Sequence, residues 1–386
     1  MFPRLVKPIE TRSFFLFGPR GTGKSTFLRE YFKLDTTLWF NLLDPELEDL
    51  LSRNPNQLQA QIKLQENQIE WVVIDEIQKV PKLLNIVHNL IETTPLKFAL
   101  TGSSAKKLKK EGANLLAGRA FVNFLLPLTS VEMGAQFKLD ETLQWGSLPL
   151  ITQLETEAEK EAYLKAYALT YLKEEIWAEH MIKNLDPFRR FLEISAQLNT
   201  EIVNYSNISR DVGVSDKTVS SYFEILEDTL VGFSLHPFHK SIRKQQRESP
   251  KFYFFDRGVA SALAHTLPQR IIPNTYGYGK AFEHFIITEI YRLNLYCNTN
   301  YRLYYLRTKD QAEIDLIIEK PDRSLTLIEI KSSSLVDDRD CQVLSTFLNA
   351  FPGATAIVLS RDTISKKIDA VLCHHWTTGL KELGFY

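Results

Sequence analysis

The sequence predicts an α/β fold in three consecutive parts, and two observations lead to this prediction. Up to about residue 150, and again after about residue 275, short apolar runs alternate with amphipathic stretches. Buried strands of a parallel sheet read as continuous hydrophobic runs, so this alternation indicates strands joined by crossover helices. Between the two regions, apolar residues recur at helical spacing. We therefore expect domains at residues 1–150, 151–270 and 271–386.

Composition limits the kinds of partner that the chain can have. It has 386 residues, of which 44% are hydrophobic, enough for two or three ordinary cores. The 46 Lys and Arg residues nearly balance 47 Asp and Glu residues, so a uniformly basic surface is excluded and any nucleic-acid contact needs a local basic patch. No apolar run is long enough to span a bilayer, and the first ten residues lack the apolar segment of a signal peptide. These features predict a cytoplasmic protein without membrane contact.

A glycine-rich loop follows the first predicted strand, residues 14–17, and precedes a predicted helix at 26–32. Its pattern, Gly-x-x-x-x-Gly-Lys-Ser, lets backbone N–H groups surround phosphates at a helix N-terminus. Lys24 would reach the β and γ phosphates of ATP, and the Ser25 hydroxyl would ligate Mg²⁺. We expect ATP to contact Gly18, Pro19, Arg20, Gly21, Thr22, Gly23, Lys24, Ser25 and Thr26. Because a glycine-rich turn can match this pattern by chance, a second element is needed.

An acidic pair supplies that second element. Asp75 and Glu76 follow the buried run Trp71–Ile74, at the carboxyl end of a predicted strand, where ligands of open parallel sheets bind. Asp75 would hold Mg²⁺, and Glu76 would polarise the attacking water. The loop and the acidic pair together predict Mg²⁺-dependent ATP hydrolysis.

Two further groups are candidates for the same site. Thr101 and Ser103 follow the strand-like run at 97–100, where either hydroxyl could sense the γ-phosphate, although a plain turn with an N-cap at Ser103 or Ser104 is equally natural. Arg119 follows a predicted short helix and could act as an arginine finger on the nucleotide of an adjacent subunit. That role requires a homo-oligomer. The alternative is an ordinary surface arginine.

The three cysteines do not indicate a metal site. Cys297, Cys341 and Cys373 form no C-x-x-C pair, so we expect buried free thiols.

A helix-turn-helix pattern closes the middle part. We expect a first helix at 208–212, a turn at 213–214, and a second helix at 216–227 with Ser215 as its N-cap. In a DNA-reading version Asp216, Lys217, Ser220 and Ser221 would face the groove, while Val219, Phe223 and Leu226 would pack inward. The basic segment that follows would contact phosphates through Lys240, Arg243, Lys244 and Arg247. A lid or a protein contact is the alternative, and the acidic residues of the second helix favour it.

The last part carries charged residues at the ends of apolar strands. Asp315 lies in one predicted strand, Glu329 and Lys331 share a face of the next, and Glu283 lies on the preceding helix. This set is typical of PD-(D/E)XK nucleases, in which Asp315 and Glu329 would bind a second Mg²⁺ and Lys331 would steady a hydroxide. The alternative is a nuclease-like fold that no longer cleaves nucleic acid, in which Lys331 only forms a salt bridge with Asp315 or Glu329. The motif here lacks the usual leading Pro-Asp.

Taken in order, GPRGTGKST, WVVIDEIQK, ALTGSSA, LAGR, KFYFFDRGVASAL, AEIDLII and LIEIK make the chain resemble prokaryotic AAA-type ATPases with a C-terminal DUF4143 domain. The resemblance spans nearly the whole chain. It implies an AAA+-like P-loop domain, a winged-helix segment and a restriction-endonuclease-like C-terminal domain. One departure is Gly146-Ser147, where the family more often has paired glycines.

Two functions follow from these patterns. The first is an ATPase that couples nucleotide state to a winged-helix and nuclease-like module acting on DNA. The second is a nucleotide-dependent switch or scaffold whose C-terminal domain recognises a partner without cutting it. A small-molecule kinase fits the glycine-rich loop but gains no support from the later motifs.

Overall fold

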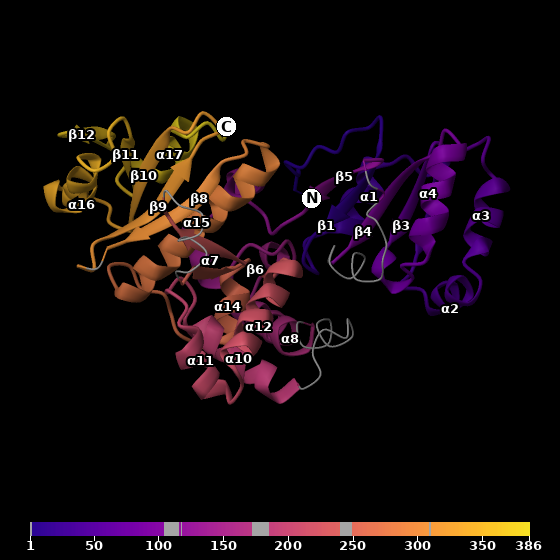
Figure 1. The fold of residues 1–386 in the computed structure, drawn as a ribbon, viewed down its shortest axis with the longest axis horizontal. Helices are drawn as coiled ribbons and strands as arrows, with labels where there is room; N and C mark the ends of the chain where they lie inside the picture. The colour runs from indigo at the N-terminus through magenta and orange to yellow at the C-terminus, as the bar shows by residue number, and fades with distance from the viewer. Residues whose placement is uncertain (1, 104–115, 117, 172–184, 240–248, 309) are drawn as a thin grey trace. The chain divides into compact units, whose positions relative to one another are not determined.

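A computed structural model describes residues 2–103, 116, 118–171, 185–239, 249–308 and 310–386 (Figure 1). The chain divides into two compact units. Unit 1 comprises Met1–Leu128, Leu148–Leu150 and Ile225–Val231, and unit 2 comprises Thr129–Ser147, Ile151–Glu224 and Gly232–Tyr386.

Unit 1 is an α/β structure with a five-stranded sheet. Its elements are β1 (Ser13–Phe17), α1 (Lys24–Tyr31), a 3₁₀ turn (Leu34–Thr36), β2 (Thr37–Asn41), α2 (Pro45–Arg53), α3 (Asn56–Lys63), β3 (Trp71–Asp75), a 3₁₀ turn (Ile77–Lys79), α4 (Leu83–Thr93), β4 (Lys97–Gly102) and β5 (Ala120–Phe124). The strand order is β2-β3-β4-β1-β5, and every pair is parallel. The parallel sheet expected for the first part of the chain is therefore confirmed.

The core of unit 1 explains why these strands are continuously apolar. Every residue of β1 and of β3 is buried. Phe17 of β1, Ile74 of β3 and Leu100 of β4 belong to one cluster with Val87 and Leu90 of α4. Burial of such side chains supplies roughly 1.5–3 kcal/mol each. Because β4 lies between β1 and β3, the carboxyl ends of these three strands are adjacent.

The helical region of unit 2 contains α6 (Ser130–Met133), a 3₁₀ turn (Gly134–Gln136), α7 (Leu139–Trp145), a 3₁₀ turn (Ile151–Gln153), α8 (Glu157–Ala166), a π-helix (Tyr167–Tyr171), α10 (Leu185–Gln197), α11 (Tyr205–Val212), α12 (Asp216–Asp228) and α14 (Arg257–Leu263). The residues of α12 from Ile225 onward belong to unit 1. The longest described helix of the unit is α15 (Tyr276–Tyr296). Among the helices that the structure describes, none combines the length and the hydropathy that crossing a membrane requires.

The sheet of unit 2 has eight strands in the order β12-β13-β11-β10-β9-β8-β6-β7. These are β6 (Gly232–Pro237), β7 (Lys251–Phe254), β8 (Arg302–Arg307), β9 (Glu313–Glu319), β10 (Leu325–Lys331), β11 (Thr355–Ser360), β12 (Lys366–Ile368) and β13 (Val371–His375), with α16 (Asp338–Leu348) and α17 (Trp376–Glu382). Strands β8, β9 and β10 form an antiparallel meander, and β11 joins β10 in parallel after α16. Since β6 pairs with β8, this sheet crosses the expected boundary at residue 270.

The predicted helix-turn-helix corresponds to α11 and α12. Gly213 forms the turn with φ of 77°, in the left-handed region that glycine adopts without strain. Ser215 Oγ accepts a hydrogen bond from Thr218 N at 3.2 Å, as an N-cap does. Asp216, expected to face a groove in a DNA-reading version, is exposed, and its carboxylate accepts hydrogen bonds from Ser206 Oγ at 2.5 Å and Ser209 Oγ at 2.6 Å. Asp216 thereby fastens α12 to α11.

The other residues expected to face a groove, and those expected to pack inward, can be compared with their solvent exposure. Lys217 and Ser221 are exposed and Ser220 is half-buried, whereas Val219, Phe223 and Leu226 are buried. The basic candidates Lys240, Arg243, Lys244 and Arg247 lie outside the described residues.

The cysteines only partly match the expectation of buried thiols. Cys341 and Cys373 are buried, with their Sγ atoms 3.5 Å apart. Cys297 is exposed, so the expectation was wrong there. It follows α15 as the C-cap residue, where the chain reaches the surface.

Candidate functional site

The glycine-rich loop occupies the turn between β1 and α1. Gly21 and Gly23 have φ of 76° and 90°, which only glycine adopts readily. Gly18 is needed for another reason: a Cβ there would lie 2.0 Å from the carbonyl oxygen of Leu125. The loop therefore turns tightly against β5 and brings its backbone to the N-terminus of α1, an arrangement suited to phosphate binding.

The Lys24 side chain lies along this loop. Its Nζ donates to the carbonyl oxygens of Gly18 at 2.7 Å and Pro19 at 3.2 Å, and the residue is buried. The ammonium group is thus held inside the loop that would surround the phosphates. Arg20 and Thr26 of the same predicted set are exposed.

A chain of hydrogen bonds joins the loop to the ends of β3 and β4. Ser25 Oγ donates to Asp75 Oδ2 at 2.6 Å, and Thr101 Oγ1 donates to Asp75 Oδ1. Thr101 also accepts from Glu76 N at 3.0 Å. The structure therefore brings together three predicted groups, and Thr101 supports the acidic pair from the intervening strand.

Glu76 adopts a backbone conformation that is uncommon for residues other than glycine. Its φ is 62°, in the left-handed region, and such outliers concentrate at functional sites. Its carboxylate accepts a hydrogen bond from Gln78 Nε2, which also lies 3.3 Å from Ser103 Oγ. Sequence reasoning missed Gln78, because a glutamine in a turn gives no signal of its own.

Arg4 contacts the loop although no sequence pattern indicated it, whereas Arg119, a predicted site residue, does not. Arg4 Nη1 donates to Thr22 O at 2.7 Å and Nη2 to Leu126 O at 2.6 Å, so a residue far from the motif in sequence braces the loop. Arg119 precedes Ala120, which pairs with Ser13 at the start of β1, whereas the loop follows the end of β1. Its side chain forms an ion pair with Glu92. The structure does not bring Arg119 to the loop of its own chain.

The residues near Asp75 fit a magnesium ion. A carboxylate and a hydroxyl already share one hydrogen bond, and Mg²⁺ commonly takes one or two carboxylates together with water and substrate phosphate oxygens. Among the described residues, no three His, Cys, Asp or Glu side chains gather into a preformed metal site.

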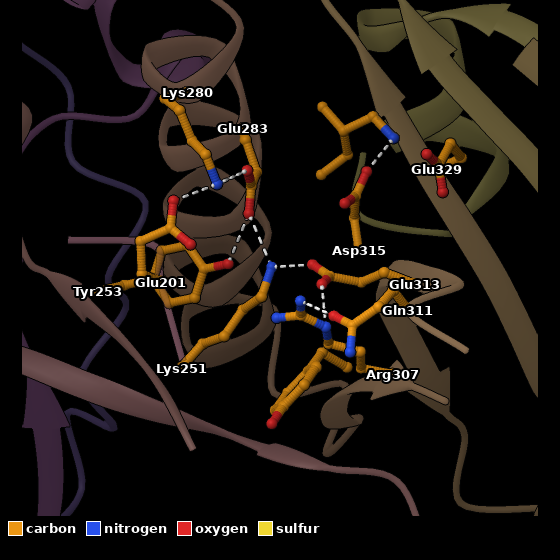
Figure 2. Close-up of polar contacts among 12 residues, drawn as sticks. Glu201, Lys251, Tyr253, Lys280, Glu283, Arg307, Gln311, Glu313, Asp315 and Glu329 are labelled. Atoms are coloured by element: carbon orange, nitrogen blue, oxygen red, sulfur yellow. Dashed lines mark hydrogen bonds and ion pairs between the residues drawn. The ribbon is translucent and has the colours of Figure 1, made fainter. Parts of the chain in front are cut away.

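The second candidate cluster lies where α15, β9 and β10 of unit 2 meet (Figure 2). Asp315 Oδ2 accepts from Ile330 N at 2.8 Å, and Lys331 Nζ pairs with Glu329 Oε1 at 2.7 Å. Glu329 Oε2 is buried and has no hydrogen-bond partner among the described residues. An orphan carboxylate oxygen beside a second carboxylate fits a cation.

The pKa values of the Asp315 and Glu329 carboxylates also favour a bound cation. Burial raises the pKa of Asp315 well above its usual range, and the charges of Glu329 and Glu283 raise it further. Burial also raises the pKa of Glu329. Burial opposes the charge on Lys331, but the Glu329 carboxylate outweighs it and raises the pKa of that ammonium. Negative charge at this point is costly without a neutralising group.

Glu283 is engaged by residues that the sequence did not single out. Figure 2 shows Lys251 of β7 between Glu283 and Glu313, with Nζ 3.2 Å from Glu283 Oε1 and 2.5 Å from Glu313 Oε1. Tyr253 OH donates to the same Glu283 oxygen at 2.9 Å. Burial opposes the charge on Lys251, yet Glu283 and Glu313 raise the pKa of its ammonium. Sequence spacing could not place β7 beside α15, so Lys251 was missed.

Three family models match consecutive parts of the chain. A model described as an AAA domain matches residues 10–134, a domain of unknown function (DUF8612) matches 136–270, and a domain of unknown function (DUF4143) matches 278–377. The predicted AAA and DUF4143 domains are therefore confirmed. The AAA match covers both the glycine-rich loop and the acidic pair.

Similar full-length proteins are themselves uncharacterised. An uncharacterised protein of Mycobacterium tuberculosis is 26% identical over 377 residues, covering 94% of this chain and 81% of that protein. Another from Methanocaldococcus jannaschii is 24% identical over 340 residues, covering 81% of this chain and 73% of that protein.

Solved structures show only weak similarity. The Orc1 protein of Aeropyrum pernix in complex with DNA has a TM-score of 0.32 and 11% identity, with 66% of this chain and 86% of that chain covered. Domain III of the replication initiation protein DnaA of Thermotoga maritima has a TM-score of 0.22 and 12% identity, with 57% and 85% covered. TM-scores this low do not establish a common fold for the whole chain.

Proposed function

We propose that unit 1 binds ATP with Mg²⁺ and hydrolyses it. The observation that carries the proposal is the hydrogen-bonded series Ser25, Asp75 and Thr101, which links the glycine-rich loop to the acidic end of β3. A loop that only formed a turn would not need this connection to two strand ends. The AAA-domain match over residues 10–134 supports the same assignment.

Each residue has a distinct role in the proposal. The N–H groups of residues 18–25 surround the phosphates, and Lys24 exchanges its loop carbonyl partners for phosphate oxygens. Ser25 and Asp75 hold Mg²⁺, which neutralises charge on the phosphates when bound. Glu76 leaves Gln78 and orients the attacking water, with Thr101 holding its backbone. Arg119 would act only on the nucleotide of a second subunit.

Steady-state ATPase assays on the full chain test this proposal. Glu76→Gln should lower kcat about a hundredfold or more while ATP still binds, because general-base catalysis contributes roughly 10²–10⁴-fold. Glu70→Gln is the matched control, since Glu70 is exposed just before β3, and it should hydrolyse ATP at the wild-type rate. Wild-type turnover by Glu76→Gln would show that another group orients the water.

We further propose that ATP hydrolysis is coupled to an action of unit 2 on DNA. The nuclease-like set is Asp315, Glu329, Lys331 and Glu283, and phosphate contacts would come from Lys240, Arg243, Lys244 and Arg247. The meander β8-β9-β10, preceded by α15 and followed by α16 and parallel β11, supports a restriction-endonuclease-like fold. The orphan oxygen of Glu329 supports a cation there.

One observation favours the alternative, a scaffold that does not cut. Lys251 already neutralises Glu283 and Glu313 from a buried position, so part of the cluster is satisfied without a metal. A Mg²⁺-dependent nuclease assay separates the two functions. Cleavage that disappears in Asp315→Ala supports the nuclease, whereas no cleavage by either protein supports the scaffold. ATPase rates measured with and without DNA then test the coupling.

A further inference from the structure

A cavity of about 340 Å³, partly open to solvent, lies in unit 2, away from the glycine-rich loop in sequence. Its walls come from the end of α10 and the segment after it, from α14 and the residues that follow it, from the start of α15, and from Gln144 of α7. The size exceeds that of a bare ion and lies in the range of small-molecule sites. None of the functions considered above uses this cavity.

The charge of the lining favours an anionic ligand. Arg257, Arg270 and Lys280 line the cavity against one carboxylate, Glu201. Lys280 is shared between Glu201 at 2.9 Å and Glu283 at 3.5 Å, and Arg270 pairs with Glu157 at 2.7 Å. These three cations leave the lining with an excess of positive charge.

Arg257 is the strongest indication of a ligand. Its guanidinium donates to Ser261 Oγ, and among the described residues it forms no other hydrogen bond or ion pair. Burial lowers the pKa of this group to about 10, which shows how far its surroundings desolvate the cation. A guanidinium carries five N–H donors in a planar fork that matches a phosphate, so the single bond to Ser261 leaves donors of this cavity-lining residue for a ligand.

Thr200 supplies an independent indication. It is 1% exposed, lines the cavity, and its hydroxyl has no hydrogen-bond partner among the described residues. Its φ is 76°, a conformation that a β-branched residue adopts only under strain. Backbone outliers of this kind concentrate at ligand-binding and active sites, which supports Thr200 as a ligand contact.

The start of α15 contributes backbone donors to the same cavity. Tyr276 and Gly277 form its first turn and line the cavity, and the N–H groups of a first turn have no acceptor within the helix. Thr275 Oγ1 satisfies Tyr278 N, at 3.3 Å. The N-terminus of this 21-residue helix therefore presents a partial positive charge to the cavity.

We infer that this cavity binds a small phosphate monoester, with the phosphate held by Arg257, Thr200 and the first turn of α15. The fork of Arg257 suits two phosphate oxygens, the Thr200 hydroxyl donates to a third, and the remaining volume holds the organic substituent. Lys280, which lines this cavity, contacts Glu283 at 3.5 Å and so links the cavity to the carboxylate cluster of Glu283, Asp315 and Glu329 (Figure 2).

Calorimetric titration of thymidine 5′-monophosphate into the full chain, saturated with Mg-ADP, tests the inference. Arg257→Gln should weaken binding about ten- to a hundredfold, the usual cost of losing hydrogen bonds to a charged group. The charge-matched control is Arg302→Gln, an exposed arginine of β8 that does not line this cavity, which should bind within about twofold of wild type. Thymidine without the phosphate should not bind.

A second variant keeps the test decisive if Arg257→Gln does not fold. Ala264→Asp adds a carboxylate to the lining and should likewise weaken binding by about tenfold or more, while thermal unfolding stays cooperative. A 5′-phosphorylated oligonucleotide, compared with its 5′-hydroxyl form, distinguishes a nucleic-acid end from a free ester as the source of the phosphate. The same affinity in wild type and folded Arg257→Gln, or equal binding of thymidine and its monophosphate, would overturn the inference. Repeating the titration in Lys24→Ala should leave it unchanged, which separates this site from the ATP site.

Discussion

Gly18 illustrates how one missing side chain permits a loop. The hydrogen bond from Leu125 N to Phe17 O, at 2.7 Å, holds β5 against the end of β1, and the Leu125 carbonyl occupies the space that a Cβ of residue 18 would need. A backbone atom cannot move aside as a flexible side chain can. The first glycine of the motif is therefore fixed by the neighbouring strand as well as by the phosphate.

Gly18→Ala should destabilise the chain by about 1–3 kcal/mol, the usual cost of overpacking, and should weaken ATP binding. Gly279→Ala is the matched control. Gly279 lies in the first turns of α15, and a Cβ there would approach Ser332 Oγ only to 3.8 Å, an ordinary van der Waals contact. It should stabilise the chain by about 0.5–1 kcal/mol. Urea unfolding measures both. Equal effects of the two substitutions would contradict the role assigned to Leu125.

Glu289 of α15 is a buried acid that makes stability depend on pH. Burial raises its pKa to about 7, and its Oε1 accepts from Ser130 N at 2.7 Å and Ser130 Oγ at 2.5 Å. An unfolded glutamate has a pKa of roughly 4.3, so between that pH and about 7 the folded chain binds a proton that the unfolded chain has released. Stability therefore falls as pH rises through this window.

Glu289→Gln should remove this dependence. At pH 8 the variant should be more stable than wild type by up to about 3 kcal/mol, and at pH 4.5 the two should differ little, since each pKa unit corresponds to roughly 1.4 kcal/mol. The amide oxygen can still accept from Ser130. Glu382→Gln, an exposed glutamate of α17, is the control and should not change the pH profile. Parallel profiles for wild type and Glu289→Gln would contradict the raised pKa.

At the scale of elements, the N-terminus of α14 is tied to the segment after α7. The Asp256 carboxylate accepts from Val259 N at 3.1 Å, as an N-cap, and from Ser147 N at 2.7 Å. Gly146 has φ of 79°, and a Cβ there would lie 2.2 Å from Asp256 Oδ1. Ser147 Oγ accepts from Arg292 Nη1 at 2.9 Å. The serine that departs from the paired-glycine pattern therefore has its own partner.

Asp256→Ala should cost about 2–4 kcal/mol, because it removes a helix cap and leaves the buried Ser147 N–H without an acceptor. Asp44→Ala removes the N-cap of α2, where Asp44 Oδ1 accepts from Glu46 N at 3.0 Å in an exposed position, and should cost much less. Chemical denaturation compares the two. A loss as small as that of Asp44→Ala would mean that Ser147 N finds another acceptor.

The elements also show what sequence could predict and what it could not. The strands at 71–75 and 325–331 were predictable because apolar runs end abruptly in charged residues. The glycine-rich loop was predictable because its motif is contiguous in the sequence. Lys251 beside Glu283 was not predictable, because their meeting depends on how β7 packs against α15. Arg4 under the loop was missed for the same reason. Contacts between distant segments leave no periodic signal in the chain.

At the scale of the whole molecule, two compact units should respond differently to nucleotide. A ligand that binds only the folded state stabilises its own unit by about 2.7 kcal/mol at a hundredfold excess over Kd. The chain passes from unit 2 to unit 1 within α12, whose residues up to Glu224 belong to unit 2 and whose later residues belong to unit 1. A change in the stability of unit 1 can therefore be detected in a helix that continues into unit 2.

Hydrogen exchange with and without Mg-bound, non-hydrolysable ATP analogue tests this. Amides of β1, α1, β3 and β4 should exchange about a hundredfold more slowly with nucleotide, in proportion to the added stability. If nucleotide state is coupled to unit 2, amides of α12 and of β9 and β10 should also change, by the smaller amount typical of coupling energies of about 1–3 kcal/mol. Lys24→Ala should abolish both effects, because the nucleotide loses its phosphate contact. Protection confined to unit 1 would leave the ATPase assignment intact but would contradict coupling to β9 and β10, because a ligand that favours one state of that region must change the populations of its states.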